Sequence, residues 1–471
     1  MTKALTPDLC VIGAGAGGLS VAAAAAAMGV AVVLIEKGEM GGDCLNSGCV
    51  PSKALLAAAH AAHRARKMSR LGVTADNIRV DFPVVMAHVR GAIRAIAPND
   101  SQARYRAMGV QVIRAAARFI APDAVEAGGF IIRARRFIVA TGSSPAMPNI
   151  TGLEQIRTLT NETIFSLDAL PAHLVILGAG AVGVELAQAF ARLGARVTVL
   201  EAKRALARED EEFVAPILDA LRRDGVDLRE HARVLRAEVR GAGFALHLED
   251  GALIEGTHLL VATGRRPHVE GLGLEAAGVR RRVDGALAGP DLRTTNRRIY
   301  LVGDAAGGPQ FTHAANDQAG LVLRATLFRL RVRAEPERVP RVLFTDPELA
   351  VCGLSEAEAR KRHGAIRVLR WPLAENDRAR AEGVTAGHVK IIAARNGRVL
   401  GAAIACPGAG EMIALWQVAA TQGLKLQAMA SLVLPYPTLN EASKRAALTA
   451  LAPMAANPWL RRLLGLLRKF G

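Results

Sequence analysis

The chain has 471 residues, 51% of them hydrophobic, so it is too long for one core and predicts roughly three domains. Its five cysteines are few and odd in number, which excludes a secreted fold held by disulfides and favours a reducing cytoplasm. The net charge is +17, but only 4% of residues are aromatic and no nucleic-acid-binding motif accompanies the arginines, so we expect no nucleic-acid partner.

The N-terminal region predicts neither a signal peptide nor a membrane span. A strand-like run begins at Leu9, directly after a short polar stretch without a cleavage site. The apolar run 19–35 is divided by Gly29, and its halves indicate an alanine-rich helix and a buried strand. We therefore expect a cytoplasmic protein.

A strand, a glycine-rich turn, a helix and a second strand follow one another at the start of the chain. The strand 9–12 leads into the sequence GAGAGG at 13–18, the helix is expected over 19–28, and the second strand over 31–35. This order is typical of a dinucleotide-binding fold.

The glycines and the acid of this first strand–turn–helix–strand segment each have a different role in such a fold. Gly13 permits the tight turn, Gly15 lets the backbone approach a pyrophosphate, and Gly18 lets helix and strand pack closely. The pyrophosphate would lie at the helix N-terminus, and Glu36 would accept hydrogen bonds from a ribose diol.

The most distinctive motif is GGDCLNSGCVPSK at residues 41–53. Cys44 and Cys49 are separated by four residues, so a disulfide between them would close a small ring and add little stability. Pro51 suits the first turn of a helix, whose amide groups and dipole would favour a thiolate at Cys49. The motif favours a redox-active pair over two free cysteines in a core.

The order of elements found at the start of the chain returns later. The strand 174–177 leads into GAGAVG at 178–183, followed by a helix over 184–193 and a strand over 196–200. The matching residues are Gly178, Gly180, Gly183 and Glu201. One such unit alone is weak evidence, but two in the same context predict two dinucleotide-binding folds.

Each unit contains a later apolar strand followed by Ala-Thr-Gly, at 140–142 and 262–264. Small residues there let the strand end lie close to a bound cofactor. The candidate contacts are Thr141, Gly142, Ser143 and Gly264. The apolar run 299–303 ends at Asp304, whose carboxylate suits a sugar-like chain of hydroxyl groups.

On these motifs, residues 7–450 resemble the class I pyridine nucleotide-disulfide oxidoreductases, which include dihydrolipoamide dehydrogenase, glutathione reductase and mercuric reductase. The resemblance implies an α/β fold with two Rossmann-like dinucleotide-binding domains and a C-terminal α+β dimerisation domain, as in glutathione reductase. It implies a homodimer in which this last domain completes the partner's active site. The implied domains are a discontinuous FAD domain at 1–149 and 265–335, an NAD(P) domain at 150–264, a dimerisation domain at 336–450, and a basic tail at 451–471.

The resemblance also implies FAD at the first glycine-rich unit and a nicotinamide cofactor at the second. The implied FAD contacts are Gly13, Gly15, Gly18, Glu36, Gly42, Lys53, Thr141, Gly142, Ser143, Asp304 and His313. The implied nicotinamide contacts are Gly178, Gly180, Gly183, Glu201 and Gly264. Because the Glu201 carboxylate would repel a 2′-phosphate, we expect NADH in preference to NADPH, although Lys203 and Arg204 follow closely.

In family terms, electrons pass from NADH through the flavin to a Cys44–Cys49 disulfide. Cys49 would be the flavin-proximal thiolate and Cys44 the thiol that meets the substrate. Lys53 would face the flavin and pair with Glu185, which follows the second glycine-rich turn.

The family's disulfide reductases carry a His-Pro-Thr-x-x-Glu motif, whereas this chain has YPTLNE at 436–441. Glu441 is kept but Tyr436 replaces the histidine, and a phenol with a pKa near ~10 is a poor proton shuttle compared with an imidazole near about 6.5. A tyrosine there resembles mercuric reductase, and two thiolates are suitable ligands for a soft metal ion. We therefore expect NADH-dependent reduction of a soft metal ion held transiently by Cys44 and Cys49.

Other readings stay open. The adjacent C-terminal cysteines typical of mercuric reductases are missing, Cys352 and Cys406 are expected in a core, and Ala181 stands where many relatives have a tyrosine, which suggests a more open nicotinamide pocket. The rival functions are a disulfide or dihydrolipoamide-type reductase that uses Glu441 or water in place of histidine, an NADH:quinone reductase, and a silent flavoprotein that only binds a partner.

The segment 458–470 predicts a basic amphipathic helix. Such a helix suits either the anionic inner face of the cytoplasmic membrane or packing on the protein's own dimer.

Overall fold

The computed structural model describes residues 3–452 and 457–470. The chain divides into two compact units, Met1–Ala205 with Asp224–Pro336, and Leu206–Arg223 with Glu337–Gly471. Within the described residues, no helix is both long and apolar enough to cross a bilayer. The two units do not separate an FAD portion from an NAD(P) portion, so the domain boundaries given above stay a prediction.

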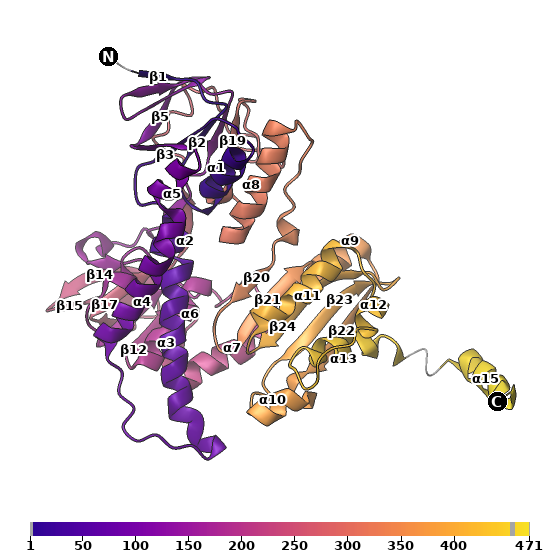
Figure 1. Cartoon of the computed structure of the whole chain (residues 1–471). Coiled ribbons are helices and arrows are strands. Elements are labelled where there is room, and N and C mark those ends of the chain that lie inside the picture. Colours follow the sequence, from indigo (N-terminus) through magenta and orange to yellow (C-terminus); the bar gives the residue numbers. More distant parts are fainter. Residues whose placement is uncertain (1–2, 453–456, 471) are drawn as a thin grey trace. The chain divides into compact units, whose positions relative to one another are not determined.

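Five parallel strands form the sheet of the first dinucleotide-binding fold. Their order is β19, β8, β2, β3 and β4, with bounds Ile299–Leu301, Arg136–Val139, Leu9–Ile12, Val32–Glu36 and Gln111–Arg114. Leu9 and Val11 share a core with α1 (Ala16–Ala27) and α8 (Thr312–Leu327), which lie beside each other in Figure 1.

The opposite face of this sheet is also covered. Cys10 and Ile12 pack with side chains of a four-stranded sheet in the order β1, β7, β6 and β5, with bounds Lys3–Leu5, Phe130–Ile132, Ala124–Ala127 and Ala117–Ala121. Because both faces are buried, β2 is an uninterrupted apolar run and not an alternating one.

The second dinucleotide-binding fold repeats this plan. Its parallel strands follow the order β10, β17, β11, β12 and β13, with bounds Thr158–Leu159, His258–Val261, His173–Leu177, Arg196–Leu200 and Val226–Arg229. α6 (Ala181–Leu193) follows β11, and one face of the sheet packs on the antiparallel strands β14 (Val234–Arg240), β15 (Gly243–Leu248) and β16 (Leu253–Gly256). In both sheets the strand before the glycine-rich turn lies between the strand that leads to the acid, Glu36 or Glu201, and the strand that precedes Ala-Thr-Gly.

Helices connect the two folds of the first unit. α2 (Gly42–Asn46) is followed by α3 (Cys49–Lys67), which packs beside α4 (Phe82–Ile96) and α6 in Figure 1. The remaining elements of this region are α5 (Gln102–Ala107), β9 (Ser143–Pro145) and β18 (Arg265–Pro267), and the last two pair antiparallel.

The second unit is built on an antiparallel sheet. The order is β20, β21, β24, β23 and β22, with bounds Arg341–Leu343, Glu348–Gly353, Val399–Cys406, His388–Ala394 and Ile366–Pro372. The helices that follow its strands in the chain include α9 (Glu356–His363), α10 (Asp377–Glu382), α11 (Ala409–Thr421), α12 (Leu426–Ala430) and α13 (Glu441–Thr449). Cys352 and Cys406 are buried in this unit's core, as predicted, and the α/β fold class with a C-terminal α+β domain is confirmed.

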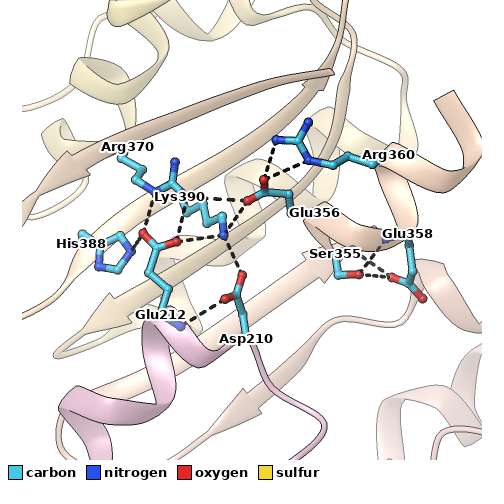
Figure 2. Close-up of polar contacts among 9 residues, drawn as sticks. All are labelled: Asp210, Glu212, Ser355, Glu356, Glu358, Arg360, Arg370, His388 and Lys390. Carbon is cyan, nitrogen blue, oxygen red and sulfur yellow. Dashed lines mark hydrogen bonds and ion pairs between the residues drawn. The ribbon is translucent and has the colours of Figure 1, made fainter. Parts of the chain in front are cut away.

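A buried lysine anchors one helix of this unit. α7 (Glu211–Arg223) lies between β12 and β13 in sequence but groups with the C-terminal sheet. Figure 2 shows Lys390 on β23 surrounded by carboxylates: its Nζ lies 2.7 Å from Asp210 Oδ2 and 2.9 Å from both Glu212 Oε2 and Glu356 Oε2. Because the Lys390 side chain is only 4% exposed, these carboxylates are needed to offset the cost of burying its charge.

The C-terminal helix α15 (Pro458–Leu467) has no buried residue, and Trp459 and Phe470 are 78% and 81% exposed. Residues 453–456 and 471 of the predicted tail lie outside the described residues.

Candidate active site

The two cysteines of the 41–53 motif lie on consecutive helices. Cys44 belongs to α2, and Cys49 is the first residue of α3, with Pro51 in the first turn as predicted. Both are free thiols that share a hydrogen bond, and Cys49 Sγ lies 3.3 Å from Thr312 Oγ1 at the start of α8.

The surroundings of the two thiols shift their pKa values in opposite directions. Hydrogen bonds from Cys44 and Thr312, together with the positive charge of Lys53, lower the pKa of Cys49 to about 6. The hydrogen bond to Cys49 and partial burial raise the pKa of Cys44. Near neutral pH the negative charge therefore rests on Cys49 and the proton on Cys44, and a thiolate is the form that attacks disulfides and binds soft metals.

Lys53 and Glu185 meet as expected. Lys53 Nζ lies 2.9 Å from Glu185 Oε2, and the Glu185 side chain is only 8% exposed. This ion pair joins α3, one turn beyond Cys49, to α6, just after the second glycine-rich turn.

A second polar contact joins the same two helices further along. Asp224 accepts hydrogen bonds from Arg192 Nε at 2.7 Å and Gln188 Nε2 at 2.9 Å on α6, and its Oδ1 lies 3.2 Å from His63 Nδ1 on α3. Burial alone would raise the pKa of Asp224, but the hydrogen bond with His63 and the charge of Arg192 outweigh it and lower this pKa to about 2. α3, which carries the thiolate, is thus held to α6 at two points.

The first glycine-rich turn leaves a cradle that side chains would fill. Gly13 has a φ of +105°, and a Cβ there would lie 2.3 Å from the carbonyl oxygen of Ala140; a Cβ at Gly18 would lie 1.9 Å from Gly13 O. The Glu36 carboxylate accepts hydrogen bonds from the amides of Ala14 and Gly38, both at 2.6 Å. These residues fit an ADP moiety, because its pyrophosphate needs close backbone approach and its ribose a fixed carboxylate.

The second turn repeats these contacts. A Cβ at Gly178 would lie 2.6 Å from Ala262 O, while Gly180 faces open space. The Glu201 carboxylate accepts hydrogen bonds from the amides of Ala179 and Lys203, both at 2.9 Å, just as Glu36 does in the first turn. A Cβ at Gly183 would lie 2.0 Å from Gly178 O, so this turn too fits a dinucleotide.

The structure places some of the other predicted FAD-binding residues near Asp304. Asp304 follows β19 and accepts a hydrogen bond from Ser143, and Thr141 donates to the carbonyl of His268. His313 stacks on Phe311 with ring centroids 5.2 Å apart. Gly42 approaches the first turn, since a Cβ there would lie 2.7 Å from Gly15 Cα, whereas Gly142 and Gly264 face open space.

The resemblance places Thr312 beside the flavin, but the sequence does not predict its contact with Cys49, nor that Asp43, Asn161 and Arg265 lie together near the thiols. Thr312 is 263 positions away from Cys49, so only the fold brings it close. Asp43, Asn161 and Arg265 form a polar cluster over the dithiol loop. Asp43 carried the one available signal, since it directly precedes Cys44.

Tyr436 and Glu441 belong to the second unit. Tyr436 is 69% exposed and its hydroxyl donates a hydrogen bond to Asp377 Oδ2 at 3.0 Å, which raises the pKa of the phenol. Glu441 is the first residue of α13. A tyrosine held in this protonated form is a poor general base near neutral pH.

The described residues contain no group of three His, Cys, Asp or Glu side chains arranged to hold a metal ion.

The comparisons agree with these features. Residues 7–319 match the family model described as pyridine nucleotide-disulphide oxidoreductase, and residues 339–447 match its dimerisation domain. The chain is 38% identical over 462 residues to a mercuric reductase of Streptomyces lividans, covering 95% of this chain and 97% of that one. It is 34% identical over 457 residues to dihydrolipoyl dehydrogenase 3 of Pseudomonas aeruginosa, covering 94% and 97%.

A solved structure of a flavoprotein disulfide reductase also matches the chain. The Cu(II) complex of the HOCl-induced flavoprotein disulfide reductase RclA from Escherichia coli matches with a TM-score of 0.82 and 30% identity, covering 93% of this chain and 98% of that one. The resemblance, the fold class and the enzyme class predicted from the sequence are thereby confirmed.

Proposed function

This chain belongs to the pyridine nucleotide-disulphide oxidoreductases, an FAD-dependent enzyme family, and we propose that it uses NADH to reduce a soft metal ion at the Cys44–Cys49 dithiol. The observation that carries the proposal is an intact dithiol combined with Tyr436 in place of the histidine of disulfide reductases. We also propose that it acts as a homodimer, since it carries the family's dimerisation domain.

The two glycine-rich turns would hold the cofactors. Gly13, Gly15, Gly18 and Glu36 fit the ADP part of FAD, and Gly178, Gly180, Gly183 and Glu201 fit the nicotinamide nucleotide. When bound, FAD relays two electrons from the nicotinamide to the sulfurs.

Reduction of the disulfide takes two electrons and one proton, and it leaves Cys49 as thiolate and Cys44 as thiol. Lys53 and Thr312 stabilise the Cys49 thiolate, and Cys44 keeps the proton. A soft divalent metal ion that binds both sulfurs displaces this proton to solvent. The two sulfurs then give it two electrons, so the metal leaves in the neutral state and Cys44 and Cys49 form the disulfide again. No imidazole is needed, because no thiol leaves the site and none has to be protonated there.

NADH preference follows from Glu201. Glu201 follows β12, and two backbone amides fix its carboxylate at the place where such folds bind the ribose 2′-hydroxyl. A fixed negative charge accepts from a hydroxyl and repels a 2′-phosphate.

The decisive experiment follows anaerobic NADH oxidation by the purified holoenzyme with Hg(II) in excess thiol, lipoamide, glutathione disulfide and a quinone in parallel. We expect turnover with Hg(II) and loss of at least about 100-fold in Cys44→Ser, with Cys406→Ser as the buried control cysteine. Faster turnover with lipoamide than with Hg(II), or full mercury turnover in Cys44→Ser, would overturn the proposal.

A second metal belongs in the same assay. RclA, the structural relative described above, has been solved as a Cu(II) complex, and copper is also bound well by thiolates. Turnover with Cu(II) but not with Hg(II) would keep the dithiol as the electron donor and change the metal, with two Cu(II) ions reduced to Cu(I) for each dithiol oxidised.

We also propose that the C-terminal helix binds the protein to an anionic lipid surface. The basic residues Arg461, Arg462, Arg468 and Lys469 fall on one side of a helical projection of 458–470, and the apolar residues Trp459, Leu460, Leu463, Leu464, Leu466, Leu467 and Phe470 fall on the other. No acidic residue lies in this segment, and α15 buries none of its residues. A helix of this kind lies in the interface of an anionic bilayer.

A further inference from the structure

The dithiol loop contains a fixed negative charge. Asp43 directly precedes Cys44 in α2, and its side chain is 41% exposed. Its Oδ1 accepts hydrogen bonds from Ser47 Oγ at 2.8 Å and Asn161 Nδ2 at 2.9 Å, and its Oδ2 lies 3.2 Å from Arg265 NH2. Three partners therefore hold this carboxylate in one place.

The loop is shaped around this carboxylate. A Cβ at Gly48, the residue before Cys49, would lie 2.9 Å from the Asp43 carbonyl oxygen and 3.1 Å from Asp43 Oδ2. Any larger residue at position 48 would push against the carboxylate, so the chain from Cys44 to Cys49 folds over Asp43. The amide of Asn161 also donates to the carbonyl of Ser47 at 3.2 Å, which fixes the same turn.

The partners of Asp43 come from outside the loop. Arg265 on β18 donates to the Ser143 hydroxyl at 2.7 Å and to the Ser143 carbonyl at 2.8 Å, and its Nε lies 3.7 Å from Asp304 Oδ2. The guanidinium is therefore shared between two carboxylates and neutralises Asp43 only in part. A positive charge also acts on Cys49, that of Lys53, which lies one turn further along α3.

We propose that Asp43 is a positioning residue whose fixed negative charge makes the Cys44–Cys49 dithiol a stronger reductant. This inference rests on the proposed function of the dithiol as the electron outlet. Reduction of the disulfide creates a thiolate, and the Asp43 charge opposes negative charge at both sulfurs. The reduced state is therefore less stable than it would be beside a neutral residue, and electrons leave it more readily.

The test measures the dithiol–disulfide equilibrium without any metal substrate. The holoenzyme is equilibrated anaerobically with mixtures of oxidised and reduced dithiothreitol, alkylated, and the free thiols at Cys44 and Cys49 are counted by mass spectrometry. We expect Asp43→Asn to shift the equilibrium about three- to tenfold toward the dithiol, which corresponds to a potential about 15–30 mV less negative.

Three variants separate charge from shape. Asp43→Glu keeps the charge and Ser47→Ala removes one hydrogen bond to the same carboxylate, so both should stay within about twofold of the wild type. Asp168→Asn removes an exposed carboxylate elsewhere and should have no effect. FAD content of each variant is checked by its absorbance.

The outcomes are distinct. An unchanged equilibrium in Asp43→Asn, or an equal shift in Ser47→Ala and Asp43→Glu, overturns the role of the charge while leaving the proposed function intact. If the wild-type thiols never form a disulfide at any buffer ratio, the proposed function and this inference both fall.

Discussion

Lys53 Nζ and Glu185 Oε2 lie 2.9 Å apart, and this contact joins the helix that begins with the Cys49 thiolate to the helix that begins after the second glycine-rich turn. Asp224, with His63 and Arg192, joins the same helices at a second point. The thiolate is thus positioned by helix packing across the two dinucleotide-binding folds and not by its own loop alone.

Removing the Lys53 charge should weaken the Cys49 thiolate. Lys53 lowers the pKa of Cys49, so Lys53→Met should raise this pKa from about 6 by about half a unit to one unit. The measurement is the rate of iodoacetamide alkylation of the reduced enzyme against pH. Lys67→Met, at the far end of α3, is the matched control, and an alkylation profile unchanged in Lys53→Met would refute the assigned role.

Acid should weaken the contact between α3 and α6. The pKa of Asp224 is lowered from 3.8 to about 2 in the folded protein, so its ionised form contributes stability above about pH 4 that is lost as the pH falls toward 2. The contribution is about 2 kcal/mol, because the side chain is buried. Urea unfolding at pH 7, 5 and 3 should show a smaller loss of stability with acid in Asp224→Asn than in the wild type. The exposed carboxylate variant Asp168→Asn should follow the wild type, and equal acid sensitivity in Asp224→Asn would contradict the assignment.

Restoring the histidine should restore disulfide chemistry. Tyr436→His replaces a phenol whose pKa is raised by Asp377 with an imidazole that exchanges protons near neutral pH. We expect NADH oxidation with lipoamide to rise at least about tenfold, while turnover with the soft metal changes by less than about twofold. Tyr436→Phe serves as the control without a proton donor. No gain with lipoamide in Tyr436→His would mean that the tyrosine is not what limits disulfide turnover.

The nucleotide preference should depend on Glu201. Glu201→Gln keeps one of the two oxygens that accept from the amides of Ala179 and Lys203, and it removes the charge that repels a 2′-phosphate. The ratio of kcat/KM for NADH to that for NADPH should fall about tenfold. Glu154→Gln, an exposed residue of the same fold, should leave the ratio unchanged. A wild-type enzyme that prefers NADPH would show that Lys203 or Arg204 outweighs the carboxylate.

The C-terminal helix should bind anionic lipid. Flotation with vesicles of phosphatidylcholine and phosphatidylserine should carry the full chain upward, and deletion of 458–471 should abolish this. Binding should weaken as salt rises, because screening reduces attraction between Arg461, Arg462 and the lipid head groups. Equal flotation of the truncated and full-length proteins would contradict lipid binding by this helix and would favour its packing on the protein's own surface.

Short-range pattern was enough to predict much of this protein. Each glycine-rich turn, its helix and its acid lie within one strand–helix–strand stretch, so Gly13 with Glu36 and Gly178 with Glu201 were readable from spacing, and the structure gives both acids the same pair of backbone amides. The cysteine pair and the change to Tyr436 were equally local.

What surrounds the thiols was decided by the tertiary structure. Thr312 reaches Cys49 across 263 positions, and Arg265 reaches the Asp43 carboxylate from a strand that only the closing of the second fold brings near. Likewise α7 groups with the C-terminal sheet through Lys390, although it lies inside the second fold in sequence. Such contacts depend on which helix faces and strand ends meet when whole sheets pack. The periodicity of a single segment predicts that one of its faces will be buried, but it does not predict which other segment will cover that face.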